Sequence, residues 1–272
     1  MPKRINGIKD IVWAVGILAA LIALLVGFFY GALGRWYGDK SRPVMDIGGA
    51  HAESGSAEKA GAGLGTVADG TLHVLQESGD AGQSYLDSLC FLVDGCFSGL
   101  RDSALTAGQV WTGENGRLGM ADYSTWRVVY PGDGSAVTVP NAAMVAKPGL
   151  LVIALGSEGL AGMSQELFTR CFEEMIAGIL SASPQTKIVI GPATGVTAAY
   201  VSDDGMSAEK AAEVNGWLQQ ICTDTGAVWA DWSGVLTDGG YLRPELAESD
   251  GHTLNSAGLS AVCGWLRTHA TA

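Results

Sequence analysis

Residues 88–100 read Ser-Leu-Cys-Phe-Leu-Val-Asp-Gly-Cys-Phe-Ser-Gly-Leu, a short apolar run that ends in an aspartate and a glycine-containing turn. An apolar run of this length, bounded by turn residues, is typical of a buried strand. Similar runs recur further along the chain. We therefore predict four core strands, at residues 89–93, 150–155, 187–190 and 227–230.

Amphipathic helical patterns separate these strands. Apolar residues recur at three- and four-residue spacing after Ser164, after Ser207 and after Ser256. Strands that alternate with helices form a mainly parallel sheet that is covered on both faces. The sequence therefore predicts an α/β fold, a three-layer α/β/α sandwich, with an inserted hairpin at residues 126–130 and 136–139.

The loops at the carboxyl ends of the strands are where we expect the chemistry. In open parallel sheets, ligands bind beyond these ends. The chain offers four such loops and, in addition, the loop before the last helix. Their order and spacing resemble those of the SGNH, or GDSL-like, hydrolase family over about residues 84–270. Four segments carry the resemblance: 88–100, 151–159 (Leu-Val-Ile-Ala-Leu-Gly-Ser-Glu-Gly), 183–190 and 250–259 (Asp-Gly-His-Thr-Leu-Asn-Ser-Ala-Gly-Leu).

Two of these blocks lack the residues that the resemblance leads one to expect. Family members usually read Gly-Asp-Ser in the first turn, where the serine is the nucleophile, but the matching residues here are Val93, Asp94 and Gly95. Glycine has no side chain, so no acyl intermediate can form on Gly95. The family usually has an oxyanion-binding asparagine in the third block, where this chain has Glu158. A carboxylate there opposes developing negative charge.

The last block is also altered. The family usually reads Asp-x-x-His, and here Asp250 is in register, Thr253 occupies the histidine position and His252 lies one residue early. The resemblance implies that Asp250 and His252 are vestigial catalytic residues. The resemblance also implies an oxyanion-binding glycine in the second block, and three residues remain open for it: Gly113, Gly116 and Gly119.

Two readings of the site follow. An active esterase, acting as an acylhydrolase or deacetylase on cell-surface carbohydrate esters, needs a relocated nucleophile, and Cys96 and Ser98 are the candidates. It also needs a displaced base and an acidic oxyanion site, and partial catalytic sets retain little activity. We therefore expect a pseudoenzyme that serves as a cell-surface glycan-binding or acylation-accessory module.

The N-terminal part of the chain predicts a membrane anchor. Residues 11–33 carry no charge, and at about 1.5 Å per residue they are long enough to cross a bilayer. A cleaved signal peptide is the alternative. We expect a single-pass signal-anchor at the cell membrane with the large domain on the extracytoplasmic side. The predicted parts are a cytoplasmic stub (1–10), the transmembrane signal-anchor (11–33), a flexible Gly/Ala/Ser-rich tether (34–84) and the hydrolase-like domain (85–272).

The charge and the cysteine content limit which partners and cofactors we expect. Residues 43–272 hold ten basic and 26 acidic side chains, which disfavours nucleic acid and anionic lipid headgroups. The five cysteines form no C-x-x-C pair and have no histidine at zinc spacing, so we expect no metal site and no cofactor. The resemblance implies a cell-surface glycan or an integral-membrane acyltransferase as partner, and an exported domain without a ligand is a third possibility.

Two tryptophans near the fourth predicted strand have different expected roles. Aromatic rings serve both core packing and stacking on sugars. We expect Trp229 to be core, while Trp232 is open between the core and the cleft.

Overall fold

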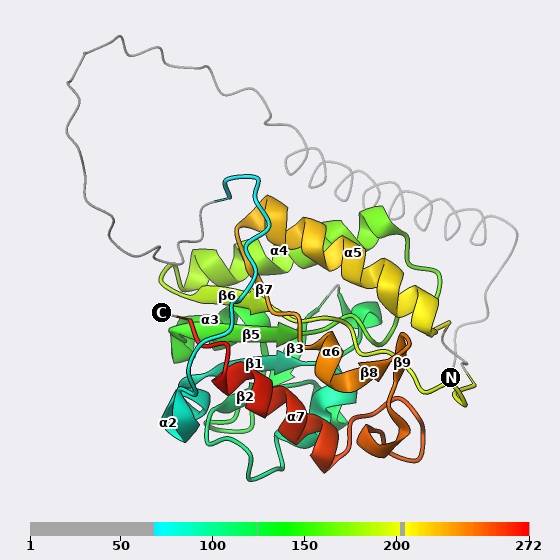
Figure 1. Ribbon diagram of the computed structural model, residues 1–272. Helices are drawn as coiled ribbons and strands as arrows, with labels where there is room; N and C mark the ends of the chain where they lie inside the picture. The colour runs from blue at the N-terminus through cyan, green and yellow to red at the C-terminus, as the bar shows by residue number, and fades with distance from the viewer. Residues whose placement is uncertain (1–67, 124, 202–204, 272) are drawn as a thin grey trace, which may run out of the picture. The chain divides into compact units, whose positions relative to one another are not determined.

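The computed structural model describes residues 68–123, 125–201 and 205–271. Within them, the main sheet has five parallel strands in the spatial order β2-β1-β5-β6-β7 (Figure 1). The α/β class and the parallel sheet are as predicted. The strands are β1 (Cys90–Val93), β2 (Gln109–Trp111), β5 (Leu150–Ala154), β6 (Lys187–Ile190) and β7 (Val228–Trp229).

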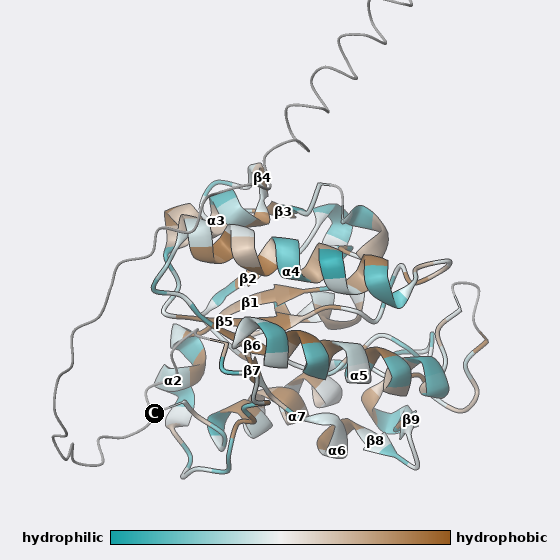
Figure 2. Cartoon of the chain, turned by 90° about the horizontal axis from the view of Figure 1, so that it is seen from above, coloured by the Kyte–Doolittle hydropathy of each residue, from teal (hydrophilic) through white to brown (hydrophobic). Residues whose placement is uncertain are grey.

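Helices cover both faces of this sheet. The helices α3 (Val139–Ala146), α4 (Gln165–Ala182) and α5 (Ala208–Thr225) pack on one face with side chains such as Leu92 and Ile153. The helices α2 (Gly82–Ser88), α6 (Ser233–Leu236) and α7 (Ser256–Arg267) pack on the other face. Successive strand residues point to opposite faces, so each strand contributes to both cores. The brown inner faces of the helices in Figure 2 are consistent with this three-layer packing.

Polar side chains cap the N-termini of the three long helices. The Ser164 side chain accepts a hydrogen bond from the Leu167 N–H, and the Ser207 side chain accepts one from the Lys210 N–H. The last helix begins at Ser256, and Asn255 caps it. Such side chains satisfy backbone donors that have no partner within the helix.

Short elements complete the described part of the chain. The predicted hairpin forms as antiparallel strands β3 (Arg127–Val129) and β4 (Ala136–Thr138). Strand β2 was not predicted because it has three residues and no clear alternation. The remaining elements are β8 (Thr237–Asp238), β9 (Tyr241–Leu242) and the 3-10 helices η1 (Gly95–Leu100), η2 (Glu114–Gly116), η3 (Met120–Asp122) and η4 (Pro244–Leu246).

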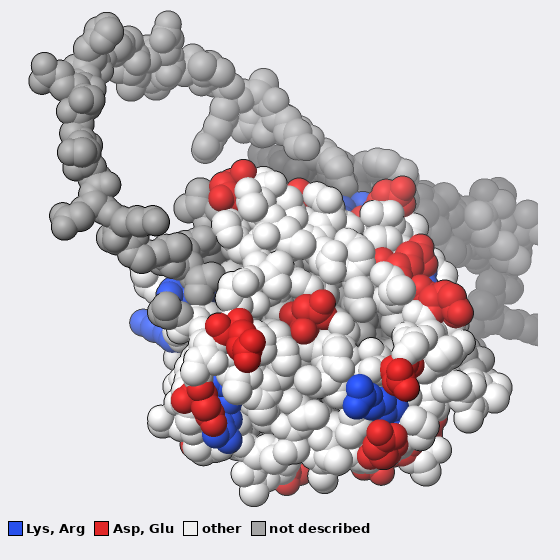
Figure 3. Space-filling model, viewed as in Figure 1, with Lys and Arg blue, Asp and Glu red and all other residues white. Residues whose placement is uncertain are grey.

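Charged side chains are sparse on the face shown in Figure 3, and acidic ones are more prominent than basic ones. This agrees with the formal net charge of −12 for the whole chain. A surface of this sign repels phosphate backbones.

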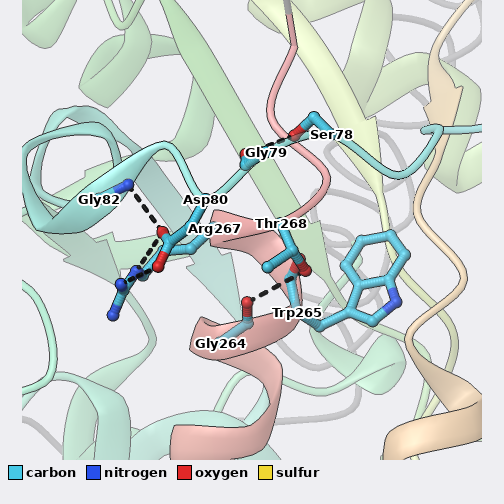
Figure 4. Close-up of polar contacts among 8 residues, drawn as sticks. All are labelled: Ser78, Gly79, Asp80, Gly82, Gly264, Trp265, Arg267 and Thr268. Carbon is cyan, nitrogen blue, oxygen red and sulfur yellow. Dashed lines mark hydrogen bonds and ion pairs between the residues drawn. The ribbon is translucent and has the colours of Figure 1, made fainter.

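Residues 73–82 form a strap along the edge of the domain. The Leu75 N–H donates to the Trp229 carbonyl, and the Trp229 N–H donates to the His73 carbonyl, so the strap pairs beside β7. Further on, the Asp80 carboxylate accepts hydrogen bonds from the Gly82 N–H and from Arg267 at the end of α7 (Figure 4). The predicted tether boundary at residue 84 is therefore too late.

The predicted membrane anchor and most of the predicted tether precede the described residues. Within the described residues, no helix combines the length and the apolar character that crossing a bilayer requires. The predicted stub at 1–10, the predicted span at 11–33 and residues 34–67 of the predicted tether lie outside the described residues.

The two tryptophans are both buried. Trp229 is 2% exposed, as expected for a core residue. Trp232 is 1% exposed, and its ring lies flush against Gly191, where an added Cβ would overlap it. Trp232 therefore packs in the core and does not stack on a sugar in the cleft.

Candidate functional site

Asp94 ties together the loops that follow β1 and β5. Its Oδ1 accepts a hydrogen bond from the Cys96 N–H at 3.1 Å, and its Oδ2 accepts one from the Ser157 N–H at 2.9 Å. The chain proceeds from β1 to β2 in one direction and places β5 and its successors on the other side of β1. Such a reversal point is where open α/β sheets bind ligands.

The carboxylate of Glu158 fills the space in which a nucleophile side chain would begin. The Gly95 N–H donates to Glu158 Oε2 at 3.1 Å. A Cβ added to Gly95 would lie 2.6 Å from the Glu158 Cδ, closer than real Cβ atoms approach other heavy atoms. The two positions that differ from the family pattern are therefore in direct contact. The absence of a side chain at Gly95 leaves the space that the Glu158 carboxylate occupies.

Of the three candidate glycines of the second block, one lies beside the loop that holds Glu158. An added Cβ on Gly119 would lie 3.4 Å from the backbone carbonyl of Glu158. Gly113 instead faces the backbone of Arg117, and Gly116 faces the side chain of Ser98. Gly119 is thus the glycine beside the third-block loop.

The backbone donors at this point already have anionic partners. The Gly95 N–H is bound to Glu158, and the Gly119 N–H donates to Asp122 Oδ2 at 2.9 Å. An oxyanion hole needs preorganised donors aimed at a developing negative charge. Here a substrate carbonyl approaching Gly95 would meet a carboxylate in place of an available donor.

His252 contacts Cys96. Its Nε2 lies 3.0 Å from Cys96 Sγ, and both residues are buried. The ring also packs against Tyr200, with the two ring centroids 5.3 Å apart. The preceding residue, Gly251, has φ +74°, a conformation that glycine adopts freely, and an added Cβ there would lie 2.5 Å from Thr197 Oγ1. The loop therefore accommodates the one-residue displacement of the histidine.

The thiol of Cys96 is held in its protonated form. Burial raises its pKa well above the ordinary value, and the negative charges of Asp94 and Glu158 add to this effect. Cys96 is 0% exposed. A cysteine nucleophile attacks as a thiolate, which a neighbouring cation or a helix N-terminus normally favours. The Cys96–His252 contact is thus a hydrogen-bonded pair without the surroundings of an activated nucleophile.

Asp250 and Ser98, the other predicted site residues, bond mainly to nearby backbone. The Asp250 carboxylate accepts hydrogen bonds from the N–H groups of His252 and Thr253, each at 2.9 Å, and from the Thr253 hydroxyl. It therefore positions His252 through the backbone of the loop. The Ser98 hydroxyl donates to the Gly95 carbonyl at 2.8 Å. Of the two substitute nucleophiles considered, the structure pairs Cys96 with the imidazole.

Asp94 is an unusual buried acid. Burial and, after it, the neighbouring Glu158 charge raise its pKa to about 7. The hydrogen bonds that its carboxylate accepts from the N–H groups of Ser157 and Cys96 lower the pKa and so oppose this rise. Two carboxyl groups that meet in one place disfavour double ionisation. Near neutral pH this corner of the site therefore changes its charge.

Ser157 and Thr194 belong to the same network, although neither was singled out from the sequence. The Thr194 N–H, after β6, donates to Ser157 Oγ at 2.7 Å. Both residues are buried. Both lie in loops that follow predicted strands, and this was the available signal. Among the described residues, no group of three or more His, Cys, Asp or Glu side chains is arranged to hold a metal ion.

Solved structures with a similar fold come from ester-cleaving enzymes and lipases. A GDSL-like lipase from Bacteroides thetaiotaomicron is 11% identical, with a TM-score of 0.47, and the match covers 69% of this chain and 89% of the lipase. A protein of Desulfitobacterium hafniense assigned to the G-D-S-L family of lipolytic proteins is 13% identical, with a TM-score of 0.46, and covers 67% and 98%.

A carbohydrate esterase of family 3 from Talaromyces cellulolyticus is 16% identical, with a TM-score of 0.42, and covers 66% of this chain and 93% of its own. No protein-family model and no curated protein matches the sequence. At these identities the likeness concerns the fold alone.

Proposed function

We propose that this chain is a non-hydrolytic, SGNH-like domain that binds a cell-surface glycan or assists an acyl-transfer enzyme at the outer face of the cell membrane. The contact between Glu158 and Gly95 is the observation that carries the proposal. It removes the nucleophile and occupies a backbone donor at the same time. Triad members act as a unit, so the remaining residues supply little catalysis.

The residues Gly95, Cys96, Glu158 and His252 form the site at the carboxyl ends of the strands, called the strand-end site below. Its chemistry favours a ligand that donates hydrogen bonds. Glu158 is partly exposed, and an ionised carboxylate is an acceptor only. Sugar hydroxyls are suitable donors, whereas an ester carbonyl is an acceptor. The fold neighbours include a carbohydrate esterase, which is compatible with a glycan ligand. The uncharged run at 11–33 supports the proposed membrane location.

An active cysteine esterase is the second candidate, and one distance favours it. Cys96 Sγ lies within hydrogen-bond reach of His252 Nε2, as a nucleophile and its base should. Against it stand the complete burial of the thiol and the charges of Asp94 and Glu158, which raise its pKa. We therefore rank it below the non-hydrolytic function.

Ester hydrolysis by the full chain separates the two. We expect p-nitrophenyl acetate to be cleaved at the buffer rate by the unaltered chain and equally by Cys96→Ala and Ser98→Ala. Turnover above buffer that disappears in Cys96→Ala would establish the second candidate. Turnover above the buffer rate that disappears in Ser98→Ala would reject both candidate functions.

Ligand binding tests the positive part of the proposal. A glycan array probed with the full chain should give signals that fall in Glu158→Gln, because the amide replaces one acceptor oxygen with a donor. Ser98→Ala serves as the matched control, since its hydroxyl is bonded to the Gly95 carbonyl. A binding pattern that is unchanged in Glu158→Gln would contradict a ligand at this site.

A further inference from the structure

An open groove of about 510 Å³ is lined by the β8–β9 ribbon, the start of η4 and the loop that follows β6. Ligand clefts usually have volumes of about 300–1,000 Å³. The lining residues used below are Ala198, Asp238, Tyr241, Arg243 and Glu245, and none of them belongs to the strand-end site. Acidic and basic side chains lie side by side over this part of the domain in Figure 3.

The backbone of the ribbon holds Tyr241 at the surface. Gly239 and Gly240 connect the two strands with φ +55° and +87°, the left-handed conformations of a tight two-residue turn. Leu242 is 1% exposed, and its N–H donates to the Val196 carbonyl, so it anchors β9 on the loop after β6. Neighbouring strand residues point to opposite faces. Tyr241 therefore points outward, and it is 40% exposed.

Three charged side chains of the lining have hydrogen-bonding groups to offer. Arg243 Nε donates to the Thr237 carbonyl at 3.3 Å, which orients the guanidinium, and its Nη groups have no partner among the described residues. Asp238 and Glu245 are exposed, and their carboxylates make no hydrogen bond or ion pair with any described residue. A guanidinium only donates and an ionised carboxylate only accepts. The groove thus presents both donors and acceptors beside an aromatic ring.

A neutral sugar matches this combination. Its hydroxyl groups both donate and accept, so they suit the carboxylates of Asp238 and Glu245 as well as the guanidinium of Arg243. The apolar face of a sugar ring can pack on an aromatic side chain such as Tyr241. An anionic guest would meet two carboxylates of its own sign. An ammonium group only donates, so it would leave Arg243 unsatisfied.

One short segment joins this groove to the strand-end site. Ala198 lines the groove, and two residues later the ring of Tyr200 packs against His252. Two residues span at most about 7 Å of backbone. Between these contacts and Val196, the Thr197 N–H donates to the Gly251 carbonyl, which ties the segment to the loop that carries His252. A chain of several sugars is long enough to contact both places.

We propose that the groove is a second sugar subsite, in which one ring of a neutral glycan stacks on Tyr241 while another part of the same chain occupies the strand-end site. The proposal rests on the glycan-binding form of the proposed function and deepens it. It assigns the ligand as a neutral oligosaccharide, and it makes Tyr241 the residue that holds the outer ring.

Isothermal titration calorimetry on the full chain tests the ligand class. The probes are three neutral hexasaccharides, namely cellohexaose, chitohexaose and xylohexaose, and one anionic chain, hexagalacturonate. We expect at least one neutral chain to bind and hexagalacturonate to bind more weakly than that chain. Absence of binding by all three neutral chains would overturn the subsite. Equal or tighter binding of hexagalacturonate would overturn the assignment to neutral glycans.

Three variants locate the subsite with the neutral chain that binds. Tyr241→Ala should weaken its Kd by roughly tenfold, because it removes an aromatic stacking surface. Tyr241→Phe keeps the ring and should bind nearly as well as the unaltered chain. Tyr123→Ala is the matched control, because Tyr123 is 38% exposed and does not line the groove. All three should unfold at nearly the temperature of the unaltered chain, since both tyrosines are exposed.

The result separates this subsite from the strand-end site. Unchanged affinity in Tyr241→Ala, or an equal loss in Tyr123→Ala, would overturn the subsite. If the same chain is weakened by Glu158→Gln, the proposed function still stands in that case. Conversely, weakening by Tyr241→Ala with no effect of Glu158→Gln would keep the groove as a sugar site and overturn its connection to the strand-end site.

Discussion

The contact between Gly95 and Glu158 leads to a stability prediction at the scale of single residues. Gly95→Ser places a Cβ against the Glu158 carboxylate, so we expect a loss of about 1–3 kcal/mol in the free energy of unfolding. Asparagine is one methylene shorter than glutamate. Gly95→Ser combined with Glu158→Asn should therefore lose less than the two single changes together. Urea unfolding of all four proteins measures this coupling, and strict additivity would contradict the contact.

The raised pKa of Asp94 predicts how stability depends on pH. Its pKa is about 7 in the folded protein, against an ordinary value of 3.8 for an aspartate. Between these values the folded protein binds more protons than the unfolded chain, so the free energy of unfolding should fall as pH rises from about 4 to 7. At 1.36 kcal/mol per pKa unit, the Asp94 contribution is at most about 4 kcal/mol. Above pH 7 it should level off.

Asp94→Asn supplies the comparison for this pH dependence. The variant should be less stable overall, because an amide cannot accept from both the Cys96 and Ser157 N–H groups. Its unfolding free energy should nevertheless change less between pH 5 and pH 7.5 than that of the unaltered chain. Parallel pH profiles in the two proteins would assign the titration to another group.

Individual site residues could be predicted only in part. The glycine and glutamate substitutions were visible because each lies in a loop after a recognisable strand, in a segment that resembles the SGNH-like family. The choice of Cys96 over Ser98 was not, because it depends on how Gly251 turns the loop before His252. The bonds that Asp94 makes to Ser157 join residues 63 positions apart, a distance that local pattern does not address.

The strap is the element whose contribution can be measured most simply. Leu75 is 8% exposed and belongs to the same core as the inner face of α7, so Leu75→Ala should cost about 2–3 kcal/mol of unfolding free energy. Val74 is 38% exposed, and Val74→Ala should cost clearly less. Thermal or urea unfolding compares them. Equal effects would show that the strap does not pack as described.

Two glycines test the packing of the helices against the sheet. Gly191→Ala should be strongly destabilising because its Cβ would overlap the Trp232 ring. Gly216 lies within α5 with no atom near its added Cβ, so Gly216→Ala should raise the unfolding free energy by about 0.5–1 kcal/mol. Melting temperatures should shift in opposite directions, and a shift of the same sign would contradict the packing.

Long, periodic elements were predictable and short ones were not. Helices α4 and α5 each place a continuous apolar stripe against the sheet, and that periodicity is written in consecutive residues. The strap was missed because it lies in a Gly-, Ala- and Ser-rich region and is held by backbone pairing to β7 and by Asp80–Arg267. Backbone pairing of this kind leaves almost no compositional trace.

At the scale of the whole molecule, the proposed membrane anchor and the folded domain should be separable. We expect the full chain to remain with membranes after alkaline carbonate washing, because residues 11–33 can span a bilayer. A chain of residues 68–272 should be released in soluble form with its melting temperature preserved, whereas residues 85–272 should melt earlier because they lack the strap. Release of the full chain by carbonate would contradict the anchor.

Covalent acylation tests the central claim most directly. The full chain can be incubated with excess p-nitrophenyl acetate and its intact mass measured, with peptide mapping of any adduct. The Glu158 carboxylate stands where a nucleophile side chain would begin, and the Cys96 thiol is buried and protonated. Peptide mapping should therefore find no acetyl group on Cys96 or Ser98. An acetyl adduct on Cys96 or Ser98 that hydrolyses on standing would contradict the non-hydrolytic assignment.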